Sequence, residues 1–181
     1  MEKSPKNYDV LIIGAGPAGA NAAISYKNLN PNLTVGLVDK AIFPRDKSCG
    51  EASGPGVISA LKRFNNEHIL DGEPQVVSTT LYGPDNIGIQ NYIPEVKNKE
   101  DSIVYVIPRV DLDNRILDLA KECGVDVYEG YSFVDFTSNL DKSLNVQIKN
   151  ENENLEFLTK ILVGADGANS RIRKKLSYKS N

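Results

Sequence analysis

The sequence predicts an α/β fold that opens with a strand, a glycine turn, a helix and a second strand. An apolar run, residues 10–13, leads directly into Gly14-Ala15-Gly16-Pro17-Ala18-Gly19, which has the GxGxxG spacing at the start of a helix. A second apolar run, residues 33–38, ends on Asp39, about 20 residues beyond the last of these glycines. Further along, strand-like runs predict antiparallel strands inserted after this βαβ unit.

The opening unit has the chemistry of a Rossmann-like dinucleotide site. The first glycine permits the tight turn, the second lets the backbone approach a pyrophosphate, and the third lets the helix pack closely on the sheet. The helix offers free N–H groups to phosphates, and we expect it to pack through Ala18, Ala22 and Ala23. Asp39 is expected to bind the ribose hydroxyls of an adenosine and to disfavour the 2′-phosphate of NADP. A glycine-rich turn of an unrelated α/β protein is the alternative.

The rest of the chain alternates between helices and short strands. The elements expected before residue 124 are a loop over 40–54, a helix from Pro55 to about Phe64, a hairpin of 76–82 and 87–92 around Gly83-Pro84-Asp85-Asn86, a strand over 103–107, and a helix from Val110 to about Glu122. The side of this last helix expected to be buried consists of Leu112, Ile116, Leu119 and Ala120. Gly124 ends it.

Four more strands are expected after this helix. They cover residues 125–128, 132–137, 144–149 and 155–163, and the first of them reads as a short buried strand. The last strand ends in Gly164-Ala165-Asp166-Gly167, which a short basic helix follows.

Composition narrows the class of protein. The chain has 181 residues, 40% of them hydrophobic and 25% charged, which predicts one ordinary globular domain over residues 1–181. A net charge of −3 gives no general attraction to nucleic acid or to an anionic membrane. Cys49 and Cys123 form no CxxC pair, and no signal peptide or membrane-spanning run is present, so we expect a cytoplasmic protein. His68 lies in a polar stretch and is expected at the surface, and no metal-ligand spacing occurs.

Three blocks in a fixed order make the prediction more specific. They are the glycine turn with Asp39, Arg109 at the start of a helix, and Asp166-Gly167 at the end of a strand. In this order they resemble the FAD domain of the flavoprotein monooxygenase and geranylgeranyl reductase superfamily, and the resemblance extends from Tyr8 to Leu176. The segment Phe43-Pro44-Arg45-Asp46-Lys47-Ser48-Cys49-Gly50 resembles the geranylgeranyl reductase branch and related hydroxylases and halogenases.

This resemblance implies a set of cofactor contacts. Residues 14–19, Asp39 and Lys40 would hold the adenosine and pyrophosphate, whereas Cys49, Gly50 and Ala52 would approach the flavin end of FAD. The Cys49 thiol could tune the flavin or place a proton, which makes this residue the candidate catalytic group. A small buried cysteine without a role is the alternative for Cys49.

Arg109, the Asp166-Gly167 pair and Val134 each have both an implied role and a plainer explanation. Arg109 would contact the cofactor, and a surface ion pair with Asp111 or Asp113 is its alternative. Asp166 with Gly167 would organise the pyrophosphate region, and Asp166 also suits an ordinary turn or helix cap. Val134 would offer a backbone contact to the adenine, and otherwise it is a core valine.

The resemblance also implies what the whole enzyme does. The family continues with a substrate domain and returns to the FAD domain, so we expect an FAD-binding domain that is incomplete at its C-terminus. The implied activity is reduction of isoprenoid double bonds by reduced flavin, with NAD(P)H or ferredoxin as electron donor and a hydrophobic small molecule as substrate. Peripheral membrane association of the complete enzyme is left open. The alternatives are a flavin-dependent aromatic monooxygenase or halogenase, and a truncated chain that binds FAD without catalysis.

Overall fold

The computed structural model describes residues 5–49, 52–92 and 104–177. The chain divides into two compact units, of which the first consists of Met1–Arg45 with Asp113–Asn181 and the second of Asp46–Leu112. The sequence predicts one domain over residues 1–181.

The first unit begins with the predicted βαβ arrangement. β1 (Lys6–Ile13) and β2 (Val35–Asp39) are parallel neighbours, and α1 (Pro17–Leu29) connects them. Both strands are almost entirely buried where valine, isoleucine and leucine follow one another, as expected of parallel strands covered on both faces. The predicted strand, turn, helix and strand are therefore confirmed, with the second strand starting at Val35.

α1 packs through one face of small residues. Its buried residues are Gly19, Ala20, Ala23 and Ile24. Ala18 is exposed, so the prediction that this residue packs on the sheet was wrong. Gly19 lies against the backbone of Gly14, which determines the side of α1 that faces the sheet. Ala23, four positions later, lies on the same side of the helix.

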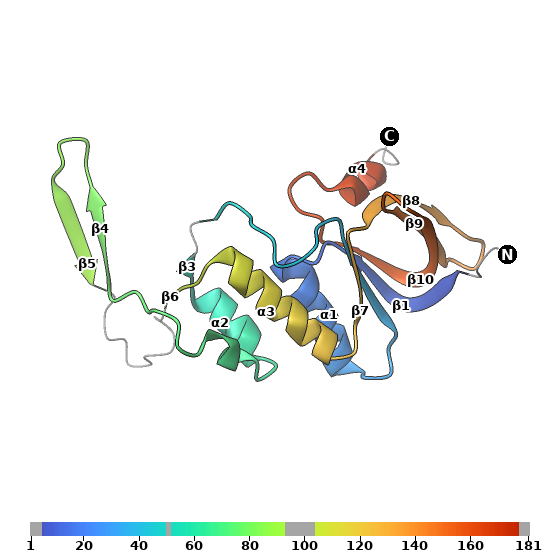
Figure 1. Cartoon of the computed structure of the whole chain (residues 1–181), viewed down its shortest axis with the longest axis horizontal. Helices are drawn as coiled ribbons and strands as arrows, with labels where there is room; N and C mark the ends of the chain where they lie inside the picture. Colours follow the sequence, from blue (N-terminus) through green and yellow to red (C-terminus); the bar gives the residue numbers. More distant parts are fainter. Residues whose placement is uncertain (1–4, 50–51, 93–103, 178–181) are drawn as a thin grey trace. The chain divides into compact units, whose positions relative to one another are not determined.

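A six-stranded sheet organises the first unit, in the order β7-β2-β1-β10-β9-β8 (Figure 1). The strands that complete it are β7 (Asp126–Glu129), β8 (Ser132–Ser138), β9 (Leu144–Lys149) and β10 (Asn154–Gly164). β10 runs parallel to β1 and antiparallel to β9, so it joins the parallel and antiparallel parts of the sheet. The strand at 125–128 is predicted to be buried, but the structure shows β7 at the edge of the sheet, with residues that are half-buried or exposed. Among the described residues β7 pairs only with β2, so its other side has no neighbouring strand.

The second unit contains short elements. They are β3 (Ala52–Ser53), α2 (Pro55–Lys62), the 3-10 helix η1 (Glu67–Leu70), β4 (Ser78–Tyr82), β5 (Gly88–Tyr92) and β6 (Tyr105–Val106). The predicted hairpin is confirmed as β4 and β5, and the strand predicted at 103–107 is only two residues long, with residue 103 outside the described residues. α3 (Arg109–Glu122) starts at the end of this unit, and α4 (Arg171–Ser177) is the predicted short basic helix.

The hairpin has one apolar face. Leu81 and Ile89 lie directly opposite one another in the ladder and are 67% and 66% exposed. Val77 comes four residues before Leu81, and Ile87 comes two residues before Ile89. Residues separated by an even number of positions lie on the same face of a strand, and both of these side chains are also exposed. Ser78, Thr80 and Gln90 alternate with them on the other face, together with Tyr82, which is also exposed.

Candidate functional site

Two of the three glycines in the turn after β1 are required by the packing of the chain itself. Gly14 has a φ of +103°, which L side chains rarely adopt, and a Cβ there would overlap the carbonyl oxygen of Ala165. A Cβ on Gly19 would overlap the carbonyl oxygen of Gly14. The backbone N–H of Gly14 donates to the Val38 carbonyl at 2.7 Å, which fixes the turn against β2.

The middle glycine is different because its surroundings leave room for a ligand. Gly16 is the N-cap residue of α1 and has no side-chain capping hydrogen bond. The nearest neighbour that its Cβ would meet is Nη2 of Arg45, at 3.4 Å. Pro17 starts the helix, where its missing N–H is not needed, and Ala15 is fully buried. The N-terminus of α1 is thus arranged to receive an anion.

Asp39 ties the end of β2 to this turn. Its Oδ2 accepts a hydrogen bond from the Ala15 N–H at 2.7 Å, and its Oδ1 accepts one from the Ala41 N–H at 2.9 Å. Carboxylate oxygens accept more than one hydrogen bond, so Asp39 retains capacity for ribose hydroxyls. The neighbouring Lys40 is exposed.

The third block lies beside the first. The Ala165 N–H donates to the Ile13 carbonyl at 2.8 Å, which places the start of the Asp166-Gly167 turn next to the glycine turn. Asp166 Oδ2 accepts from the N–H of Arg171, the first residue of α4, at 2.7 Å, so Asp166 ties its turn to the start of this helix. The helix cap itself is Ser170, whose hydroxyl accepts from the N–H of Arg173 at 2.9 Å. Its Oδ1 is buried and has no hydrogen-bond partner among the described residues. A buried carboxylate oxygen without a partner indicates a missing donor.

Val134 is not a core valine. It is 40% exposed and lies at an irregularity of the β8–β9 ladder, between Phe133 and Asp135. Arg171 Nη1 donates to the Phe133 carbonyl at 3.1 Å, so the helix after the Asp166 turn also holds this bulge. An exposed residue at a bulge suits a contact with a ligand.

The other predicted residues belong to the second unit. Cys49 is exposed, so its explanation as a small buried filler was wrong, and Ala52 is an exposed residue of β3. Arg109 is the first residue of α3, as predicted, whereas Gly50 lies outside the described residues. The structure therefore brings together the glycine turn, Asp39 and Asp166, and it does not place Cys49, Ala52 or Arg109 relative to them.

One pair at the turn was missed by the sequence analysis. Arg45 and Asp113 form an ion pair at 3.3 Å in the first unit, and the Asp113 side chain is completely buried. Asp113 occupies the same side of α3 as Ile116 and Leu117, which are buried as well. A charged residue within an apolar helix face is the signal that could have identified it.

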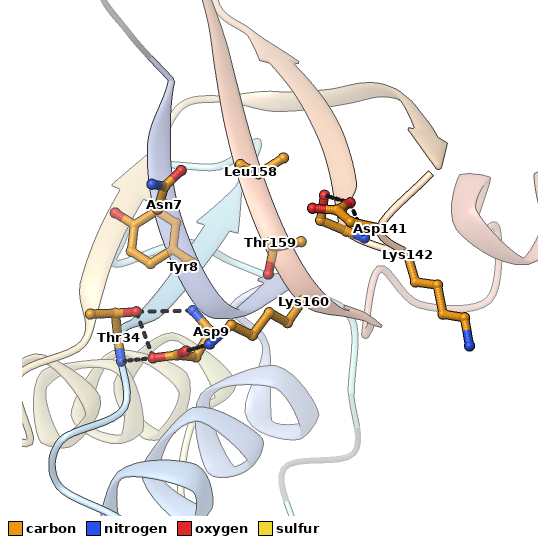
Figure 2. Close-up of a pocket in the computed structure, with 10 residues that line it drawn as sticks. Asn7, Tyr8, Asp9, Thr34, Asp141, Lys142, Leu158, Thr159 and Lys160 are labelled. Carbon is orange, nitrogen blue, oxygen red and sulfur yellow. Dashed lines mark hydrogen bonds and ion pairs between the residues drawn. The ribbon is translucent and has the colours of Figure 1, made fainter. Parts of the chain in front are cut away.

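The described residues also form a depression beside the first residues of β1, at the end of that strand opposite to the glycine turn. It is lined by residues at the start of β1 and in the middle of β10, together with Thr34 and the loop before β9 (Figure 2). Hydrogen bonds from Lys160 and from the backbone and hydroxyl of Thr34 lower the pKa of Asp9 to about 2. None of the predicted site residues lines it. Because the glycine turn follows the carboxyl end of β1, the depression is not part of that site.

Neither a cluster of metal ligands nor a membrane-spanning helix occurs among the described residues. No group of three or more histidine, cysteine, aspartate or glutamate side chains is arranged to hold a metal ion there. No helix within these residues combines the length and the apolar character needed to cross a membrane. His68 is exposed, as predicted.

Comparisons with known proteins agree with this geometry. The family model described as "FAD binding domain" matches residues 64–181. The chain is 29% identical over 168 residues to menaquinone reductase of Mycolicibacterium smegmatis, covering 93% of this chain and 39% of that protein. It is 27% identical to digeranylgeranylglycerophospholipid reductase of Picrophilus torridus, covering 96% of this chain and 43% of that protein. The chain thus spans about two-fifths of the length of these relatives.

A solved structure shows the same fold at much lower identity. p-Nitrophenol 4-monooxygenase from Pseudomonas putida superposes with a TM-score of 0.82 and 14% identity, over 94% of this chain and 44% of that one.

The residues of the first unit fit FAD. The uncapped N-terminus of α1 suits a pyrophosphate, the carboxylate of Asp39 suits ribose hydroxyls, and the unpartnered Asp166 Oδ1 suits a hydroxyl or a bound water. These groups follow the carboxyl ends of the adjacent parallel strands β2, β1 and β10, where ligands of α/β sheets bind. With the match over most of its length, the chain belongs to the FAD-binding domain family.

Proposed function

We propose that the chain binds FAD through the carboxyl ends of β2, β1 and β10. The observation that supports this most directly is the convergence of the glycine turn, Asp39 and Asp166, three blocks that are far apart in sequence. Within the proposal, Gly14 to Gly19 face the pyrophosphate, Asp39 and Lys40 the ribose, Val134 the adenine, and Asp166-Gly167 the pyrophosphate region. For Cys49, Gly50, Ala52 and Arg109 the proposal rests on the family resemblance alone.

A titration tests this part of the proposal. The purified chain is titrated with FAD and flavin fluorescence is recorded, with NAD as the control ligand. We expect saturable quenching with FAD, and weakening of roughly tenfold or more in Arg109→Ala and Asp166→Asn, because each variant removes a charged hydrogen-bonding group. Equal affinity for NAD and FAD, or no binding of either, would contradict the proposal.

For the reaction, we propose an FAD-dependent oxidoreductase that reduces isoprenoid double bonds. Support comes from two relatives whose names describe reductases of prenyl-bearing or quinone lipids, and from the segment Phe43 to Gly50. The electron donor would be NAD(P)H or ferredoxin, and the substrate a hydrophobic small molecule. Reduced flavin, when bound, supplies the hydride.

The protein's own contribution would be orientation and a proton. The α1 N-terminus and Asp39 would hold the adenosine half of the cofactor, which keeps the reactive ring in one place. The exposed Cys49 thiol is the candidate for placing a proton on the reduced substrate or for tuning the ring. Product mass spectrometry after incubation with geranylgeranyl lipids or menaquinone and a reductant tests this role, because Cys49→Ala should lower the yield of saturated product without lowering FAD affinity.

The second candidate is a flavin-dependent monooxygenase or halogenase. It is favoured by the similarity of the fold to p-nitrophenol 4-monooxygenase. The two candidates differ in their use of oxygen, because a monooxygenase consumes oxygen in step with NAD(P)H and a prenyl reductase works without it. An oxygen electrode therefore separates them, and FAD binding with neither activity would favour the third possibility, a binding module without catalysis.

A further inference from the structure

We infer that Arg45 is a pyrophosphate-binding residue, held over the glycine turn by the buried carboxylate of Asp113. This inference rests on the proposed binding of FAD and adds to it a cation that was not among the predicted site residues. Both residues belong to the first unit.

The position of the guanidinium is the first step. Among the described residues, Arg45 Nη2 is the nearest atom from another segment to the point where a Cβ of Gly16 would lie, at 3.4 Å. Gly16 is the N-cap of α1 and has no side-chain cap. The positive guanidinium therefore stands beside the positive end of the helix dipole, and Asp113, which pairs with the same Nη2, offsets part of the repulsion. An anion at this place would be attracted both by the guanidinium and by the helix end.

The support of Arg45 is the second step. Asp113 is 0% exposed and contacts Arg45 Nη2 at 3.3 Å, whereas the Arg45 side chain keeps 18% of its surface exposed. A buried carboxylate is costly unless it is paired, so Asp113 holds Arg45 strongly to this place. The guanidinium also lies over the ring of Phe43, 4.9 Å from its centroid.

Arg45 has N–H donors that its ion pair with Asp113 does not use. A guanidinium has five N–H donors in a rigid fork, and a single ion pair uses at most two of them. The exposed side of Arg45 can therefore donate to phosphate oxygens while its inner side stays on Asp113. Asp113 acts here as a positioning residue, because it works through Arg45 and not on the ligand.

The test compares FAD binding of the wild type, Arg45→Met, Arg45→Lys and the control Lys47→Met, which removes an exposed cation from the same segment. We expect Arg45→Met to weaken FAD binding roughly tenfold or more and to flatten its dependence on salt. Arg45→Lys should restore part of the affinity, and Lys47→Met should change it less than twofold. Unchanged affinity and salt dependence in folded Arg45→Met would overturn the inference and leave FAD binding intact.

A second measurement uses the wild-type chain and does not depend on FAD. Inorganic pyrophosphate is titrated while the side-chain NMR signals of Arg45 and the amide signal of Gly16 are followed. Saturable shifts of both support the inference even if Arg45→Met does not fold. A shift of Gly16 without Arg45, or no shift of either, overturns it. Pyrophosphate binding at Arg45 without any FAD binding would instead refute the proposed function.

Discussion

The carboxylate of Asp39 accepts a hydrogen bond of 2.7 Å from the backbone N–H of Ala15, and this bond connects the end of β2 to the glycine turn after β1. The second carboxylate oxygen accepts from Ala41 at 2.9 Å, so one side chain organises both the turn and the loop that leaves β2. Asp39 is thus both a structural residue and a candidate ribose ligand.

Asp39→Asn should affect stability and binding together. The amide keeps the shape of the side chain but presents one N–H₂ group to a backbone N–H, so one of the two charge-assisted hydrogen bonds is lost. We expect a loss of about 1–3 kcal/mol in the free energy of unfolding, measured by urea denaturation, and weaker FAD binding. A variant as stable as the wild type would show that these two bonds contribute little.

The three glycines of the turn should separate into two classes. Gly19→Ala places a Cβ on the Gly14 carbonyl, and we expect it to destabilise the chain by at least about 2 kcal/mol. Gly16→Ala meets Arg45 at 3.4 Å and places alanine, a poor N-cap residue, at the start of α1, so we expect a loss of about 1 kcal/mol or less while FAD binding weakens. Gly56→Ala is the matched control in a helix where no atom of the described residues from another segment lies within 4 Å of the new methyl group, and it should be neutral or slightly stabilising. Equal stability losses in Gly16→Ala and Gly19→Ala would contradict this division.

The acid stability of the chain should depend on Asp9. Hydrogen bonds from Lys160 and Thr34 lower the pKa of Asp9 to about 2 from an ordinary value of 3.8. Because the folded pKa is the lower one, this stabilisation is complete above pH 3.8 and is lost as the pH falls toward 2. Asp9→Asn should therefore be less stable than the wild type near neutral pH, and the difference should shrink over that acid range in pH-dependent urea melts. A constant difference would show that the contribution is not electrostatic.

The two cysteines should react at different rates. Cys49 is exposed, whereas burial and the nearby Glu122 carboxylate raise the pKa of the half-buried Cys123. We expect iodoacetamide to modify Cys49 roughly tenfold faster near neutral pH, because the thiolate is the reactive form. Peptide mapping by mass spectrometry measures both rates in one sample, and Cys49→Ala and Cys123→Ala identify each signal. Protection of Cys49 by FAD would support its proposed place near the flavin, and an unchanged rate would argue against it.

The elements that sequence predicts well here are those with a strong local signal. The helix from Arg109 to Glu122 has a regular apolar side and a glycine stop, and the hairpin around residues 83–86 has a turn that few other structures accept. The burial of β7 and the phase of α1 at Ala18 were wrong, because both depend on which element packs against them rather than on local pattern.

Some residues of the candidate site could likewise be predicted from local sequence, and others could not. The glycine turn, Asp39 and Asp166 could be predicted because their types and spacing are those of a dinucleotide-binding motif, and the fold brings them together. The bulge at Val134 and the pair of Arg45 with Asp113 arise from contacts between segments distant in sequence. Of these features, only Asp113 has a sequence signal, because it is a charged residue on the apolar side of α3.

The apolar face of the β4–β5 hairpin has a practical consequence for handling the protein. Two-stranded sheets are marginally stable alone, and within the described residues this one offers exposed Leu81, Ile87 and Ile89 beside strand edges that pair with no third strand. Such edges promote strand-to-strand association between molecules as concentration rises. Charged substitutions such as Ile89→Lys should therefore extend the concentration range over which the chain remains monomeric in light scattering, and binding studies should begin with dilute samples.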